Sequence, residues 1–177
     1  MKQKESSPFK EIMLPTLIGM VAALAVLFFI KTEFGLVIVD GSSMNPTYYN
    51  GDLLQGAKPV KELQRGDIIT FRENGQTLIK RIVGLPGETI SWKGGYLYIN
   101  GARMTTDFPK MQDGGILDEK TITLTDDEYF CLGDNRNNSM DSRVFGPVKK
   151  SQISLVITDT IIDTRLIKER IFGHDKN

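Results

Sequence analysis

A serine and a lysine are the residues of this sequence best suited to nucleophilic chemistry. Ser43 lies in the run GSSMNPT (41–47), and Lys80 lies in TLIKRIV (77–83). A serine hydroxyl is a weak nucleophile until an adjacent base takes its proton. Histidine, the usual base, occurs once, as His174 in the polar C-terminal tail, and the single cysteine is Cys131. Lysine is therefore the base to expect, and Lys80 has the most telling surroundings.

Ser43 lies where an apolar run gives way to a loop rich in Gly, Ser, Asn and Pro. Pro46 disfavours the helical conformation for Asn45 and pushes it toward extended geometry. A serine at such a junction is exposed on a defined backbone. Most serines in turns only cap or hydrogen-bond locally, so a structural role is the plain alternative.

Lys80 lies in an aliphatic run that is typical of a strand, where side chains alternate between two faces. It therefore shares a face with Leu78 and Ile82, while Arg81 lies on the opposite face with other aliphatic residues. The amine can extend to water along its aliphatic stem. If it is desolvated instead, its pKa falls below the ordinary ~10.4 and the neutral form becomes accessible. Only the second arrangement makes Lys80 a base.

A third segment, GDNRNNSMDSR (133–143), combines acidic, basic, amide and hydroxyl side chains. Such a set indicates a polar network that braces a site, or simply a well-bonded turn. A calcium-binding EF-hand loop is the obvious competitor. Arg136 would occupy its third ligand position, Ser139 would replace its glycine, and Phe145 would replace its terminal glutamate, so the pattern fails.

The composition excludes several classes of function. The 177 residues carry 22 Lys and Arg and 22 Asp and Glu, so there is no basic excess of the kind that nucleic-acid binding needs. One histidine and one cysteine cannot build a zinc site from the usual ligands. We expect no metal and no cofactor.

An uncharged segment precedes these residues. Residues 13–30 form an apolar run of 18 residues, which as a helix would span roughly 27 Å, close to the ~30 Å of a bilayer core. More lysines precede the run than follow it, so residues 1–12 are expected to be a cytoplasmic tail. A cleavable signal peptide and a buried helix are the alternatives. The length of the run and the lack of small residues at its end favour an uncleaved transmembrane helix.

From residue 34 onward the pattern is that of an all-β domain, 34–177, with a small β excursion about 88–127. Short β-branched and aromatic runs alternate with Gly, Pro, Asn and Asp. Asn74-Gly75 and Asn100-Gly101 predict hairpin turns. The charged stretch 163–170 fits helix or strand equally well. The predicted strands are 34–39, 52–55, 67–72, 77–84, 89–92, 96–99, 121–124, 128–132 and 153–162.

These features together resemble the bacterial type I signal peptidases, in the compact Gram-positive form. The resemblance runs from the apolar segment to about residue 148. It is carried by four motifs in order, SMNPT (43–47), RGDII (65–69), KRIVGLPGE (80–88) and GDNRNNSMDSR (133–143). The fold it implies is a single N-terminal transmembrane helix followed by an all-β catalytic domain.

The resemblance implies a Ser/Lys dyad in which Ser43 attacks the scissile carbonyl and neutral Lys80 takes its proton. It implies that the Ser139 hydroxyl orients the lysine amine and that Asp141 and Arg143 brace the region. Some members have a hydroxyl donor to the oxyanion two residues before the nucleophile. Here that residue is Gly41, which leaves the second donor unassigned.

The same resemblance implies a substrate site and partners. Val37, Val39, Met44 and Ile79 are the pocket candidates for small residues at −1 and −3, with ordinary core packing as the alternative. The expected partners are secreted pre-proteins and membrane lipid, with no nucleic acid, and the expected location is the cell membrane with the catalytic domain outside the cytoplasm. A non-proteolytic pilus-assembly factor and a self-cleaving regulator on the same fold are the competing readings. The first is expected to lack the serine or the lysine, and the second would need a DNA-binding domain before the catalytic one.

Overall fold

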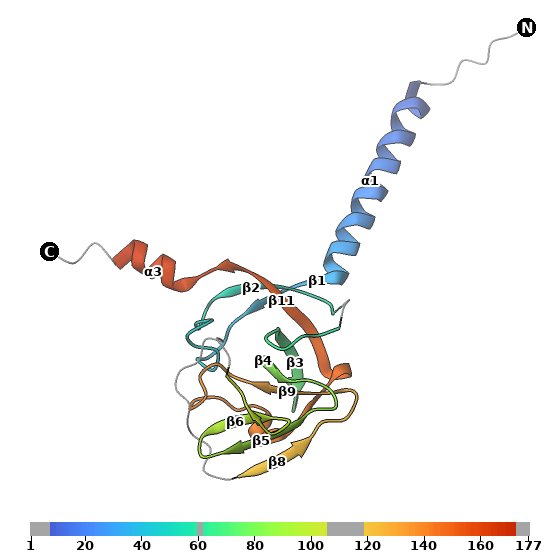
Figure 1. The fold of residues 1–177 in the computed structure, drawn as a ribbon. Coiled ribbons are helices and arrows are strands. Elements are labelled where there is room, and N and C mark those ends of the chain that lie inside the picture. The colour runs from blue at the N-terminus through green and yellow to red at the C-terminus, as the bar shows by residue number, and fades with distance from the viewer. Residues whose placement is uncertain (1–7, 60–61, 106–118, 173–177) are drawn as a thin grey trace, which may run out of the picture.

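The structure, a computed structural model, describes residues 8–59, 62–105 and 119–172, and within the helices the side chains of residues 8–11, 27–32 and 172 are not described. One long helix projects from a body made of two β-sheets (Figure 1). The elements are α1 (Pro8–Glu33), β1 (Phe34–Ile38), β2 (Leu53–Ala57), β3 (Ile68–Glu73), β4 (Gln76–Gly84), β5 (Thr89–Lys93), β6 (Tyr96–Ile99), β7 (Ala102–Arg103), β8 (Lys120–Thr123), β9 (Glu128–Leu132), α2 (Ser142–Phe145), β10 (Val148–Lys149), a 3-10 turn (Lys150–Gln152), β11 (Ile153–Ile162) and α3 (Thr164–Phe172).

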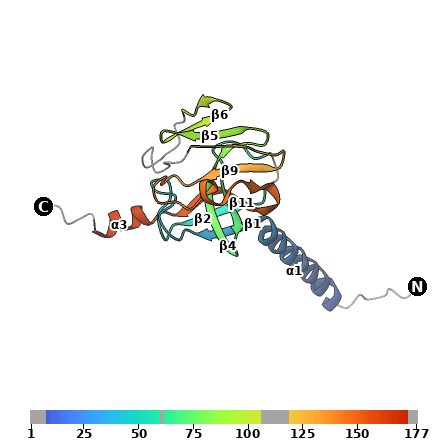
Figure 2. The same cartoon turned by 90° about the horizontal axis from the view of Figure 1, so that it is seen from below.

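The strands form a large antiparallel sheet in the order β1-β2-β11-β3-β4-β9-β10 and a small one in the order β7-β6-β5-β8. The prediction of a mainly β fold is therefore confirmed. The small sheet lies at the end of the body away from α1 (Figure 2).

Strand β4 is the centre of the body because its side chains enter all three hydrophobic clusters. Ile82 packs with Ile69 and Phe71, Val83 packs in a second cluster against the small sheet, and Ile79 packs in a third. With both faces of β4 covered, its polar residues are forced out of water. This packing buries Lys80 and Arg81.

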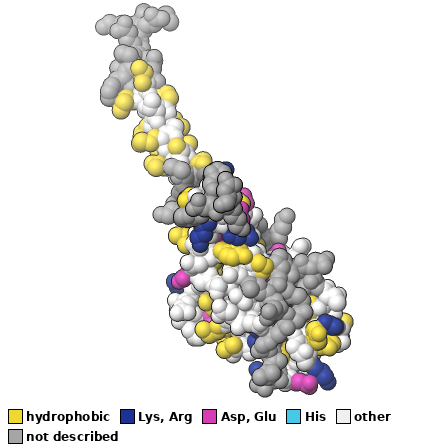
Figure 3. Space-filling model, turned by 90° about the vertical axis from the view of Figure 1, so that its left-hand side faces the viewer, with side chains coloured by type: hydrophobic (Ala, Val, Ile, Leu, Met, Phe, Trp, Pro, Cys, Tyr) yellow, Lys and Arg dark blue, Asp and Glu magenta, His cyan; other side chains and the backbone are white. Residues whose placement is uncertain are grey.

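Helix α1 extends away from both sheets, and its described side chains, residues 12–26, are uncharged and exposed. Figure 3 shows hydrophobic side chains along this projection. Among the described residues, no helix meets the length and apolarity that a membrane crossing requires. The predicted transmembrane helix, 13–30, lies partly outside this set, because the side chains of residues 27–32 are not described.

Several element boundaries differ from the prediction. β2 runs through Gly56 to Ala57, although glycine is poor in strands, because hydrogen bonds to β1 on one side and β11 on the other hold it. The short β7, α2 and β10 were not predicted, since two to four residues carry no periodicity. The stretch after residue 163, undecided from sequence, is the helix α3. Residues 106–118 of the turn-rich excursion lie outside the described residues.

Candidate active site

Ser43 lies in the loop between β1 and β2, which folds back on itself. The amide of Asn45 donates to the carbonyl of Ser42 at 3.1 Å, and the amide of Thr47 donates to the carbonyl of Met44 at 2.8 Å. Met44, next to the serine, is fully buried and anchors the turn. Gly41 enters the loop with φ +93°, a left-handed conformation that glycine tolerates best.

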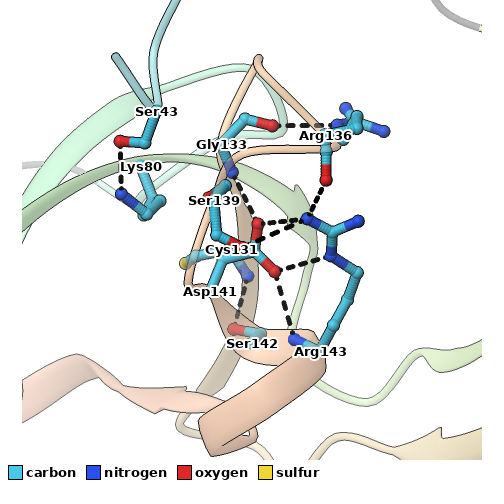
Figure 4. Close-up of polar contacts among 9 residues, drawn as sticks. All are labelled: Ser43, Lys80, Cys131, Gly133, Arg136, Ser139, Asp141, Ser142 and Arg143. Atoms are coloured by element: carbon cyan, nitrogen blue, oxygen red, sulfur yellow. Dashed lines mark hydrogen bonds and ion pairs between the residues drawn. The ribbon is translucent and has the colours of Figure 1, made fainter. Parts of the chain in front are cut away.

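The amine of Lys80 meets the hydroxyl of Ser43 across this loop. Lys80 Nζ lies 2.8 Å from Ser43 Oγ (Figure 4). It also donates a hydrogen bond to the carbonyl of Ile79 at 2.8 Å. The lysine is 3% exposed. The alternative in which its amine extends to water is therefore wrong.

Burial lowers the pKa of Lys80, because an ammonium loses hydration that the surrounding side chains do not replace. The negative charge of Asp141 opposes this shift, but the net direction remains downward. A lysine with a lowered pKa is neutral over a wider range of pH and can accept a proton from a hydroxyl.

The polar loop 133–143 is held together around Asp141, which is fully buried. Its carboxylate accepts from the amide of Gly133 at 3.0 Å and from Arg143 Nε at 2.8 Å. Arg143 also donates through Nη2 to the carbonyl of Arg136 at 2.6 Å. The Asp141 side chain caps α2. The structure thus brings Asp141 and Arg143 together at the base of the loop (Figure 4).

Ser139 lies against Gly133, so closely that a methyl group on Gly133 would be 2.2 Å from Ser139 Oγ. This oxygen is buried and makes no hydrogen bond to any described residue. It therefore does not bond the Lys80 amine here, and its role in orienting that amine stays a prediction.

Two asparagines of the same loop donate hydrogen bonds to the turn that carries Ser43. The amide of Asn135 donates to the carbonyl of Ser43 at 3.0 Å, and its side chain donates to the carbonyl of Ser42 at 3.1 Å. Asn138 Nδ2 donates to Ser42 Oγ at 2.8 Å. The contacts of Asn135 fix the peptide planes on either side of Ser43. Sequence reasoning did not assign them.

Arg81 was also missed. Its guanidinium forms a two-pronged ion pair with Asp134, at 2.8 Å from Nε and 2.6 Å from Nη2, with both side chains buried. Thr47 Oγ1 donates to the same carboxylate at 2.5 Å, and Arg81 Nη1 donates to the carbonyl of Gly66. The sequence did carry a signal, because a charged residue between aliphatic residues on a predicted strand is expected to be buried. A buried charge needs a partner of opposite charge. The pair joins the strand of Lys80 to the polar loop and to the loop of Ser43.

The four pocket candidates, Val37, Val39, Met44 and Ile79, fall in a single hydrophobic cluster with Leu54 and Ile68. Ile79 also supplies the carbonyl that accepts from Lys80. The cluster therefore lies beside the contact between Ser43 and Lys80. Within the described ranges, His, Cys, Asp and Glu form no group that could hold a metal ion.

The chain is similar to known proteins of one family. The family model described as signal peptidase, peptidase S26, matches residues 11–158. This chain belongs to that family. It is 39% identical over 137 residues to signal peptidase I V of Bacillus subtilis, which covers 68% of this chain and 82% of the relative. It is 37% identical to signal peptidase I of Bacillus amyloliquefaciens, over 68% of this chain and 72% of the relative. A crystal structure of a signal peptidase I from Enterococcus faecalis, 37% identical, covers 56% of this chain and 99% of its own, with a TM-score of 0.48.

Proposed function

We propose that this chain is a membrane-bound serine endopeptidase that removes N-terminal signal peptides from exported pre-proteins. The observation that carries the proposal is the 2.8 Å separation of Ser43 Oγ and Lys80 Nζ at a lysine that is 3% exposed. Burying an amine lowers the stability of the fold, so a residue with a purely structural role would gain nothing from this position. Membership in the peptidase S26 family supports the same conclusion.

In the proposed mechanism, neutral Lys80 has two N–H bonds and one lone pair. One N–H is held by the carbonyl of Ile79, which turns the lone pair toward the hydroxyl of Ser43. As Ser43 Oγ bonds the scissile carbonyl carbon, its proton moves to Nζ, and Nζ returns it to the leaving amine. Water then hydrolyses the acyl-enzyme, with Lys80 again as the base.

The oxyanion of the tetrahedral intermediate needs hydrogen-bond donors directed at the oxygen of the scissile carbonyl. The backbone N–H of Ser43 makes no hydrogen bond to any described residue and is a candidate donor. Its direction is set by the contacts of Asn135 and Asn138 with the turn. Gly41 offers no side-chain donor.

Substrate binding is proposed to use the edge of the large sheet. β1 is an edge strand of the large sheet, so its outer side can pair with an extended peptide. In such a peptide the residues at −1 and −3 point to the same side. The half-buried Val37 would line their pockets, above the buried side chains of Val39, Met44 and Ile79, so that the pockets would admit only small side chains.

The membrane anchor is proposed to be α1, with residues 13–30 in the bilayer, residues 1–12 in the cytoplasm and the β domain outside it. The uninterrupted apolar run and its flanking lysines support this arrangement. Tethering concentrates the enzyme where a signal peptide leaves the membrane.

The test is incubation of the detergent-solubilised full chain with a pre-protein that carries Ala at −1 and −3, followed by sequencing of the new N-terminus. Cleavage after the −1 residue is expected. Ser43→Ala and Lys80→Ala should each abolish cleavage. The control substitutions Ser154→Ala and Lys93→Ala, at exposed positions, should leave cleavage unchanged. Normal processing by either dyad variant would show that the assignment is wrong.

A further inference from the structure

The last strand of the large sheet brings the following residues back to the loop that carries Ser43. β11 pairs with β2, the strand that follows this loop, and residues 163–165 lead from β11 into the first turn of α3. The family model ends at residue 158, so these three residues lie beyond it. The match to the family therefore assigns them no role.

Asp52, at the end of the loop, is a carboxylate that is held from two sides. It is 1% exposed. Its Oδ2 accepts a hydrogen bond from the amide of Tyr49 at 2.8 Å. Its Oδ1 accepts from the amide of Thr164 at 2.8 Å and from the hydroxyl of Thr164 at 2.6 Å. A carboxylate removed from water needs such donors, and Thr164 supplies two of these three.

Arg165, the next residue, contacts the middle of the same loop. Its Nη1 donates to the carbonyl of Pro46 at 3.4 Å. Its guanidinium lies over the ring of Tyr49, 4.7 Å from the centroid, where a cation is attracted to the face of the ring. Thr164 and Arg165 together contact the loop at Pro46, Tyr49 and Asp52. We call these two residues the C-terminal clasp.

The clasp is itself held in place. Asp163 Oδ1 accepts from Arg165 Nε at 3.0 Å, and Asp163 Oδ2 accepts from Arg165 Nη2 at 2.7 Å, so the direction of the guanidinium is set. Thr164 packs closely on Gly51, where an added methyl group would lie 3.3 Å from Thr164 Cγ2. The loop and the first turn of α3 therefore fit against each other without spare room.

The contact between Ser43 and Lys80 depends on where this loop lies. Lys80 is on the central strand β4, whereas Ser43 is on a loop, and loops open more readily than core strands. Asn135 holds the loop at Ser43, and the clasp holds it at residues 46–52. A displacement of about 1 Å at a reacting group can lower a rate by about 10²-fold.

We propose that the C-terminal clasp positions the nucleophile: Thr164 and Arg165 hold residues 46–52 so that the hydroxyl of Ser43 stays within hydrogen-bond reach of Lys80. The inference rests on the proposed function and adds two positioning residues to the same reaction. Both act through the loop rather than by touching the reacting atoms.

The experiment uses the detergent-solubilised full chain. The double variant Thr164→Val/Arg165→Met removes the hydroxyl and the guanidinium but keeps the amide of residue 164 and similar side-chain volumes. Thr164→Ser is the conservative variant, because it keeps the hydroxyl that donates to Asp52. Lys168→Met is the matched control, because it removes an exposed cation about one turn further along the same helix.

The first measurement is the kinetics of pre-protein cleavage, expressed per folded molecule, with the folded fraction taken from urea denaturation at the same temperature. The kcat of the double variant should fall by about tenfold to 10²-fold. Its KM should stay unchanged, because the clasp lies away from the edge of β1 where the substrate is proposed to pair. Thr164→Ser and Lys168→Met should keep the wild-type kcat. A clasp that only stabilises the fold would leave kcat per folded molecule unchanged, and this result overturns the proposal.

The second measurement is hydrogen exchange, followed by mass spectrometry of peptides that cover residues 44–52 and β4. In the double variant the amides of Thr47 and Tyr49 should exchange at shorter times than in the wild type, because the loop opens more often. The amides of β4 should exchange at the wild-type rate. Equal exchange of residues 44–52 in the two proteins overturns the proposal.

The two measurements separate this inference from the proposed function. A wild type that cleaves, together with a double variant of wild-type kcat, disproves the clasp and leaves Ser43 and Lys80 as assigned. A wild type that does not cleave contradicts the proposed function, and exchange alone then decides whether the clasp holds the loop.

Discussion

Replacing Lys80 by methionine separates the chemistry of the amine from its effect on folding. Methionine has a similar length and fills the same buried space, but it has no charge and no proton to exchange. The variant loses the hydrogen bonds of Nζ to Ser43 Oγ and to the carbonyl of Ile79. Each such bond contributes about 1 kcal/mol, which changes little with pH.

The pH-dependent part follows from the pKa. Burial holds the pKa of Lys80 below its ordinary value in the folded chain. Between the folded pKa and ~10.4, the unfolded chain therefore binds more protons than the folded one. The stability of the wild type must rise with pH through that window, by about 1.4 kcal/mol for each unit of pKa difference. Below the folded pKa the whole destabilisation is present, and above ~10.4 it is absent.

Lys80→Met removes this dependence. The unfolding free energies of the variant and the wild type are measured by urea denaturation at a series of pH values. The variant should be most stable relative to the wild type near neutral pH, and this difference should shrink as the pH rises toward 10. Cleavage of the pre-protein should fall by about 10⁴-fold, the upper end of what a positioned general base contributes. In the wild type, kcat/KM should rise about tenfold per pH unit until the pH passes the pKa of Lys80.

The reasoning fails if the two stability profiles run parallel from neutral pH to 10, because the amine would then have an ordinary pKa. It also fails if the activity limb lies at or above 10.4, the value of an unperturbed lysine.

Two further predictions concern the supports of the dyad. Gly133→Ala should destabilise the fold by about 1–3 kcal/mol and impair cleavage, because its methyl group would lie 2.2 Å from Ser139 Oγ. The control is Gly19→Ala, where the added methyl group meets open space, and equal urea midpoints for the two variants would contradict the prediction. Arg81→Met should lower the free energy of unfolding by about 3–5 kcal/mol, because it leaves Asp134 buried without its cation. Adding Asp134→Leu should restore part of the lost stability, and no restoration would mean that loss of the ion pair does not cause the destabilisation.

Local features of the fold could be predicted because they depend on neighbouring residues. Asn74-Gly75 and Asn100-Gly101 have positive φ at both positions, as a two-residue hairpin turn of this type requires. The alternating aliphatics of β4 gave its extent to within one residue. The helix α3 was undecidable because its four apolar residues and four charged residues suit either a helix or a strand.

The site was predictable in part. Ser43 and Lys80 were chosen by elimination of other bases and by resemblance to a family, but residue types alone could not give the 2.8 Å contact between positions 37 apart. The partner of Arg81 lies 53 positions away, in a loop whose conformation depends on many contacts at once. Long-range pairs of this kind have no local signature, so Asp134 could not be matched to Arg81 beforehand.

The direct junction of α1 and β1 limits where this enzyme can cut. Ser43 follows Glu33 by ten residues, so even a fully extended chain would keep the nucleophile within about 33–36 Å of the helix end. If α1 is the membrane anchor as proposed, the direct junction makes the height of the Ser43 hydroxyl above the bilayer a property of the fold. A scissile bond would then be selected by its distance from the membrane as well as by its side chains, and inserting residues between Glu33 and Phe34 should shift the preferred bond away from the lipid.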